Sequence, residues 1–180
     1  MGNESLLPVA PALDEPLEML EACHQRIEQQ LNTLERLRAY LPEHGADETA
    51  RRAAQGVLRY FRLAGPNHHA DEEQDLFPAL LRRATGNDAK TLVGLIDILL
   101  VEHAQMADAL AVVLSQLEPI ALGAGTTLDA SAVERVAGLY RRHIECENLE
   151  LLPLARRWLT PPDIERLSVT MTARRQVGTS

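Results

Sequence analysis

The stretch NHHADEEQDLFPALLRR, residues 67–83, combines polar and apolar residues in an order that an ordinary surface helix does not show. Leu76, Phe77 and Leu80 recur at helical spacing and indicate a buried face, while two adjacent histidines and several acidic residues occupy the turns that lead into it. Residues four apart share one face of a helix, with their Cβ atoms about 5–6 Å apart. The stretch therefore predicts an amphipathic helix that carries imidazoles and carboxylates towards the interior.

The composition of the whole chain favours helices over sheet. Its 180 residues suit one domain, and 46% of them are apolar, whereas aromatic residues make up only 3%. Leu, Ala, Glu and Arg dominate, and these residues favour helices. The net charge of -8 leaves no basic surface for phosphates, so the composition argues against a protein that binds nucleic acid or an anionic membrane.

The first 13 residues predict a flexible tail in front of a single domain that covers residues 14–180. Prolines break the short apolar pieces of this tail and no basic segment precedes them, which argues against a signal peptide or a membrane-spanning helix. The two cysteines, Cys23 and Cys146, are too few for a disulfide framework. These features together predict a cytoplasmic protein.

Apolar residues at steps of three and four predict four long helices, which begin near residues 14, 47, 87 and 129, and a shorter one at about 161–176. Pro42 and Gly45 are expected to end the first helix and Pro119 the third, and Gly65-Pro66 either kinks the second helix or divides it in two. No strand pattern or repeat competes with the helices. We predict an all-α protein, an antiparallel up-down four-helix bundle with a short extra C-terminal helix.

Histidines occupy core positions on two of the apolar stripes. His103 stands between Leu99 and Met106, where the spacing demands a core residue, and His24 occupies the same kind of position on the first helix. A lone inward histidine is more often a hydrogen-bonded core residue than a metal ligand. Either role places the two imidazoles inside the bundle.

The other two long helices each carry a histidine followed by a glutamate four residues later. On the fourth helix these are His143 and Glu147. On the second helix His69 and Glu73 are favoured, because Glu73 is in phase with Phe77 and Leu80. His68 and Glu72 have the same spacing and remain an alternative.

Buried carboxylates need a partner, because an unpaired charge between helices costs several kcal/mol. The inward set as a whole therefore predicts metal binding by His24, His69, Glu73, His103, His143 and Glu147. Imidazole and carboxylate without thiolate suit iron, manganese or zinc. Two ions are favoured over one, since two bridging carboxylates and four imidazoles give each ion four bonds and leave positions open for a solvent-derived bridge and a small ligand.

This ordered set resembles the hemerythrin-like, or HHE cation-binding, domain family. The resemblance rests on His24, HHADEEQDLFP, Glu102-His103 and HIECENLELLP, and it covers roughly residues 14–159. It implies a four-helix bundle around two iron ions with an oxo or hydroxo bridge, and Glu73 and Glu147 as the bridging carboxylates. Oxygen carriers of the family have a second histidine four residues after the first on the third helix. Ala107 stands there, which leaves the ion of His103 with an open position and argues against plain oxygen carriage.

The leading functional hypothesis is a cytoplasmic di-iron protein that binds or reacts with oxygen, nitric oxide or peroxide in sensing, detoxification or iron handling. A di-iron oxidase or peroxidase is an alternative, although the sequence identifies no acid behind the ligands and no substrate pocket. A metal-free helical interaction protein is a further alternative. Whether the protein is an enzyme stays open. Beyond the small ligand, the expected partners are at most a second copy of the chain in a homodimer.

Overall fold

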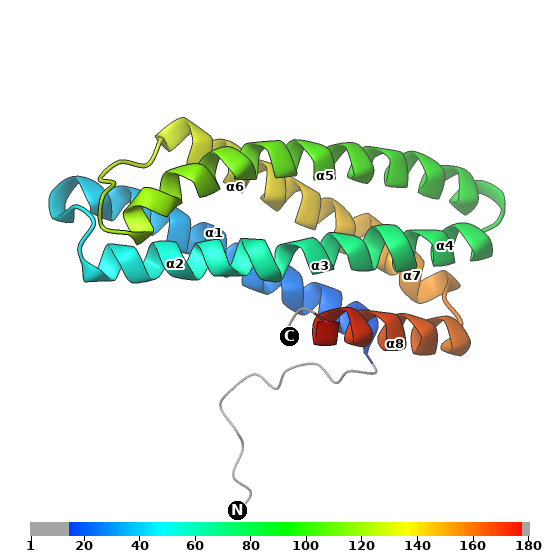
Figure 1. Ribbon diagram of the computed structural model, residues 1–180. Helices are drawn as coiled ribbons and strands as arrows, with labels where there is room; N and C mark the ends of the chain where they lie inside the picture. Colours follow the sequence, from blue (N-terminus) through cyan, green and yellow to red (C-terminus); the bar gives the residue numbers. More distant parts are fainter. Residues whose placement is uncertain (1–14, 178–180) are drawn as a thin grey trace, which may run out of the picture.

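The computed structural model describes residues 15–177, and this part of the chain forms helices and no strand (Figure 1). The all-α prediction is therefore confirmed, while the expected tail, residues 1–13, lies outside the described residues. The elements are α1 Pro16–His44, α2 Glu48–Leu63, α3 Gly65–Ala70, the π-helix η1 Asp71–Leu76, α4 Phe77–Arg83, α5 Gly86–Ala121, α6 Ala130–Cys146, the π-helix η2 Glu147–Leu151, α7 Leu152–Trp158 and α8 Pro161–Val177.

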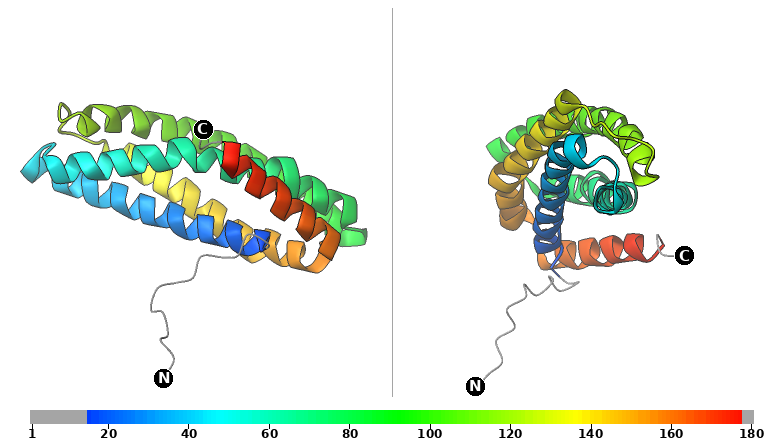
Figure 2. Two further views of the ribbon diagram at one scale, coloured as in Figure 1. Left: turned by 60° about the horizontal axis from the view of Figure 1, so that its bottom comes forward. Right: turned by 90° about the vertical axis from the view of Figure 1, so that its left-hand side faces the viewer.

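These elements build four rods around a common centre (Figure 2). One rod is α1, one runs from α2 to α4, one is α5 and one runs from α6 to α7. The α1 rod packs against α2 and α6, and α5 packs against the same two helices from the other side. Gly65-Pro66 thus marks a break within one rod, while α8 lies outside the ring against α1 and η1.

Two prolines that were predicted to end helices stand inside them. The α1 helix continues through Pro42 to His44 and ends at Gly45, whose φ is 63°. The α5 helix continues through Pro119 to Ala121. The prediction was wrong because the last turn of a helix can hold a proline, whose missing N–H removes only one hydrogen bond there. Each helix ends near a glycine, which adopts positive φ without strain, and for α1 this is Gly45, as predicted.

The apolar core consists of two clusters that follow one another along the bundle. Buried leucines supply much of both, and each fully buried leucine contributes about 1.5–3 kcal/mol. Each rod has one residue of each cluster on either side of the place where the clusters meet. In the first cluster these residues are Ile27, Phe61, Met106 and Tyr140. In the second cluster they are Leu20, Leu76, Leu99 and Leu151. Every rod crosses from one cluster to the other, so the residues at the boundary form a layer between two apolar regions.

The α5 helix is, by length and composition, the one helix among residues 15–177 that could cross a membrane, with a mean hydropathy of 1.5. Its buried side contributes to both clusters and packs against α2 and α6. A core helix of a bundle passes the same test.

The α8 helix is tied to the second rod by a buried ion-pair cluster. Asp71, in η1, is fully buried, and its carboxylate accepts hydrogen bonds from Arg174 and, at 2.6 Å, from Arg175. Leu167 and Met171 anchor the apolar side of α8 in the second cluster. The helix thus holds the segment that immediately precedes Glu72.

Arg175→Ala is expected to lower the free energy of unfolding by about 2 kcal/mol, because a buried carboxylate loses one of its two charged donors. Chemical denaturation of the two proteins measures the difference. Arg156→Ala is the control, since Arg156 is 42% exposed and its ion pair with Glu21 should contribute at most about 1 kcal/mol. Equal losses in both variants would contradict a stabilising role for the contact between α8 and η1.

Candidate metal centre

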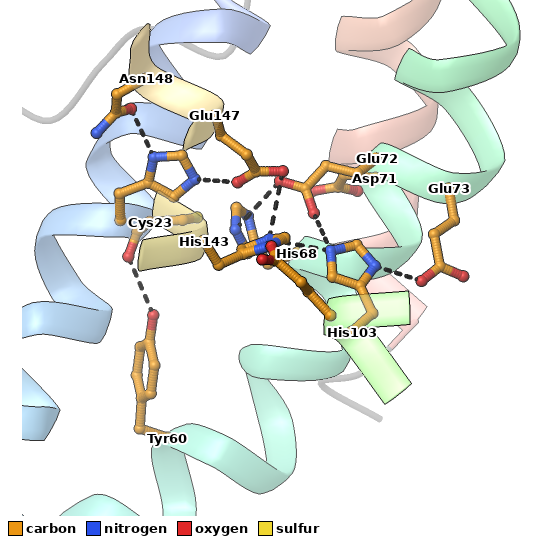
Figure 3. A network of polar contacts seen from close by, with 12 residues as sticks. Cys23, Tyr60, His68, Asp71, Glu72, Glu73, His103, His143, Glu147 and Asn148 are labelled. Atoms are coloured by element: carbon orange, nitrogen blue, oxygen red, sulfur yellow. Dashed lines mark hydrogen bonds and ion pairs between the residues drawn. The ribbon is translucent and has the colours of Figure 1, made fainter. Parts of the chain in front are cut away.

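Six polar side chains meet in the layer between the two apolar clusters (Figure 3). All six are buried, and each rod supplies at least one: His24 from α1, His68 and Glu72 from the second rod, His103 from α5, and His143 and Glu147 from the fourth rod. They form two groups whose potential ligand atoms lie within 4.8 Å of one another. Each group has its own pair of histidines, and both carboxylates belong to both groups.

Glu147 faces both histidine pairs at once. One of its oxygens, Oε2, lies 3.0 Å from Nε2 of His24, and the other, Oε1, lies 3.4 Å from Nε2 of His143. The carboxylate therefore turns one oxygen to each group, which is the orientation of a bridging ligand.

Glu72 repeats this arrangement from the opposite rod. Its Oε1 lies 3.2 Å from Nε2 of His68, and its Oε2 lies 3.5 Å from Nε2 of His103. Two atoms bound at about 2.1 Å to one ion, and about 90° to 110° apart, are separated by about 3.0–3.5 Å. The four nitrogen–oxygen spacings are thus those of atoms that share an ion.

Most of these atoms have no hydrogen-bond partner in the protein. Within residues 15–177, the buried side-chain atoms that lack such a partner are Nε2 of His24, both ring nitrogens of His68, Oε2 of Glu72 and both carboxylate oxygens of Glu147. Nε of Arg38 is the one further atom of this kind in the same range. Each buried polar atom left in this state costs about 1–3 kcal/mol. A cation between the oxygens and nitrogens would satisfy them together, and a donor set without thiolate fits iron, manganese or zinc.

Both carboxylates stand at the start of a π-helical turn. The N–H of Phe77 donates to the carbonyl of Glu72, five residues earlier instead of the usual four, and η2 begins at Glu147 in the same way. A proline follows each turn, Pro78 and Pro153. A proline ring clashes with the carbonyl four residues before it in an α-helix, and a wider turn relieves that clash.

The π turn in η1 explains why the structure replaces His69 and Glu73 in the candidate set by His68 and Glu72. Counting back four residues from Phe77 predicts Glu73 on the inner face, but the extra residue in the turn puts Glu72 there. Glu73 is exposed, and its Oε1 lies 2.6 Å from Nδ1 of His103. His69 is half-buried and stacks on the His103 ring, with 4.0 Å between centroids. Neither belongs to the two groups.

Three of the four inward histidines are held from behind through Nδ1. Besides the contact of His103 with Glu73, Nδ1 of His143 lies 2.9 Å from Oε2 of Glu102, and Nδ1 of His24 lies 2.8 Å from Oδ1 of Asn148. An acceptor at Nδ1 fixes the proton there and leaves Nε2 free to bind a metal. The expectation that no acid stands behind the ligands was therefore wrong.

The buried charges perturb each other strongly. Burial, reinforced by the nearby Glu147 carboxylate, raises the pKa of Glu72 well above its usual range. Burial opposes ionisation of Glu147 as well, but the nearby imidazoles of His143 and His24 hold its pKa well below the usual range. Burial, together with His143, lowers the pKa of His103 to about 4. At neutral pH His103 is therefore in the neutral form that binds metals.

The remaining sequence candidates lie outside the two groups. Ala107 is exposed, and the fully buried residue one turn from His103 is Met106. The structure therefore does not place Ala107 beside an open metal position. Cys146 packs against the second apolar cluster, and Cys23 is half-buried next to His24 in α1.

Two comparisons with known proteins show what the chain is similar to. The family model described as the hemerythrin HHE cation binding domain matches residues 15–155. An uncharacterized protein of Haemophilus influenzae is 32% identical over 164 residues, which are 91% of this chain and 92% of that protein. The family match covers all six side chains of the two groups.

Proposed function

Because the chain belongs to the family of hemerythrin HHE cation-binding domains, we propose that the buried cluster holds two iron ions that bind or react with a small ligand. One observation carries the proposal: each of two buried carboxylates, Glu72 and Glu147, turns one oxygen to each pair of histidines. Each ion would receive two nitrogens and two oxygens, which leaves one or two positions open. The fold that we propose with it is an antiparallel up-down bundle, supported by the short connections between successive rods.

When bound, iron would supply the open positions for oxygen, nitric oxide or peroxide and the electrons that such ligands accept. The protein holds the four imidazoles in a layer with apolar residues on both sides, which excludes bulk water. We propose a role in sensing, detoxification or iron handling in the cytoplasm for a protein that binds such ligands.

An oxidase or peroxidase activity is a second candidate, favoured by the acids behind the histidines. The carboxylate of Glu73 is 40% exposed and contacts His103, so it connects the buried layer with solvent. Reduction of oxygen or peroxide consumes protons, and a carboxylate in this position can deliver them.

Metal analysis of protein purified without chelator tests the proposal directly. Two iron ions per chain are expected from iron-sufficient cells, together with near-ultraviolet absorption that decreases on anaerobic reduction and changes again when nitric oxide is added. A ceiling of one metal per chain would overturn the di-iron proposal. Turnover of peroxide by the loaded protein, lost in Glu73→Gln with the iron content unchanged, would favour the enzyme over the binding protein.

A further inference from the structure

The histidines of one group have negative charge behind them. The His103 ring is backed by the Glu73 carboxylate at 2.6 Å, and the His143 ring by the Glu102 carboxylate at 2.9 Å. A carboxylate behind an imidazole makes the ring a stronger donor and adds negative charge near the ion. We call His103 and His143 the carboxylate-backed pair.

The histidines of the other group have no such charge. Nδ1 of His24 contacts the side-chain amide of Asn148, which is neutral. Nδ1 of His68 is buried and has no hydrogen-bond partner in the described part of the chain. A ring whose outer nitrogen lacks an acceptor is the weaker ligand, because its N–H stays unsatisfied when the other nitrogen binds a metal. We call His24 and His68 the amide-backed pair.

The amide-backed pair also has a route to solvent on its own side of the layer. A surface groove of about 790 Å³ is lined by His24, Asn148, Glu21, Glu28 and Glu145, among others. The groove runs between α1 and the fourth rod, and Asn148, which lines it, contacts the His24 ring. Arg141, which also lines the groove, pairs with Glu28, and Arg156 pairs with Glu21. Of the three carboxylates named, Glu145 would therefore attract a cation that enters or leaves at this end.

We infer that the two groups hold iron unequally: the carboxylate-backed pair fills first and retains its ion, whereas the amide-backed pair exchanges its ion through the groove. This inference rests on the proposed di-iron site. It assigns Glu73, Glu102 and Asn148 as positioning residues that set the affinity of the two groups. The ligands Glu72 and Glu147 belong to both groups, so we assign the difference to the residues behind the histidines.

Release of iron to a chelator measures the inequality. Protein loaded anaerobically with two ferrous ions is mixed with excess ferrozine, and the coloured complex is followed with time. We expect two phases of one ion each, with rates that differ at least about 10-fold, the lower limit for the effect of a hydrogen-bonded partner behind a ligand. Mixing apo protein with one equivalent of iron should fill only the site that releases slowly.

Matched variants assign the phases to the two groups. Glu102→Gln should accelerate the slow phase by about 10- to 100-fold and leave the fast phase unchanged. Asn148→Asp places the missing carboxylate behind His24 and should slow the fast phase by a similar factor. Because Asn148 is exposed, this substitution is expected to fold, and far-ultraviolet circular dichroism checks that it does.

The outcomes separate this inference from the proposed function. Wild-type protein that never holds more than one ion contradicts the di-iron site itself. Two ions that leave in a single phase overturn the unequal affinities and leave the di-iron site intact. If Glu102→Gln accelerates the fast phase, or if Asn148→Asp does not slow the fast phase, the assignment of the two phases to the two histidine pairs is overturned.

Discussion

Glu72→Gln is expected to reduce the iron content from two ions per chain to one or fewer. The substitution replaces an anionic oxygen with an amide group at a position that serves both histidine pairs, where Oε1 and Oε2 face His68 and His103. Neither ion would keep its full set of charged ligands. Iron and protein are quantified on the same sample after gel filtration, so the ratio is measured directly.

Glu73→Gln is the matched control, because it removes the same charge from the next residue. Its side chain is 40% exposed and contacts His103 from behind, so the ligand atoms that face the ions remain in place. Iron should bind about 10- to 100-fold more weakly at one position, but two ions per chain are still expected in excess iron. If Glu73→Gln lost the metal and Glu72→Gln kept it, the histidine and glutamate ligands of this rod would be His69 and Glu73 after all.

The sequence predicts the inward position of Glu147 from residues that precede it. Val136, Tyr140 and His143 lead to Glu147 along α6, and regular α-helical spacing holds up to that residue, since η2 begins there. In the second rod the helical phase comes from Phe77 and Leu80, which follow the π turn. Counting back across that turn gives an error of one residue, so the sequence favours Glu73 over Glu72.

The prolines after both π turns are visible in the sequence, but the sequence alone does not show how the helix responds to them. Phe77-Pro78 and Leu152-Pro153 look like ordinary helix signals, because a proline can also kink or end a helix. Which response occurs depends on how the neighbouring rods pack. Glu102 and Asn148 could not be assigned for a related reason: each contacts a histidine on another rod, and helical spacing within one rod says nothing about that contact.

Removal of the metal is expected to lower the melting temperature strongly. Each ion held at about 1,000 times its dissociation constant contributes about 4 kcal/mol, or about 10 °C in a chain of this size. The apo protein is also left with Glu72 and Glu147 oxygens that lack hydrogen-bond partners in the interior. Scanning calorimetry before and after chelation, at one pH, measures the loss. Equal melting temperatures would contradict a buried metal site.

The loss of stability on removal of the metal should grow as the pH rises above 6.5, and Glu72 is the main reason. Its pKa is raised by burial above the ordinary value of 4.5, so folding favours the protonated acid, and this stabilisation is lost as the pH rises towards the folded pKa. His69 and His103 act in the opposite sense. Burial lowers their pKa values to about 3 and about 4, so they destabilise the apo protein only as the pH falls below 6.5. Above that pH Glu72 acts together with His143, whose pKa, although burial opposes this, is raised by Glu147 and Glu102.

Apo Glu72→Gln provides the decisive comparison, because glutamine has nearly the same shape and cannot ionise. As the pH rises from 4.5 towards the folded pKa of Glu72, the wild-type apo protein should lose up to about 1.4 kcal/mol per pH unit for the one proton that Glu72 gives up, whereas this variant should change less. The apo variant should therefore be the more stable protein at pH 8, although it is the poorer metal binder. Wild-type and variant apo proteins with parallel stability curves would show that Glu72 is ionised at no cost, and the buried carboxylate would then need another partner than a metal.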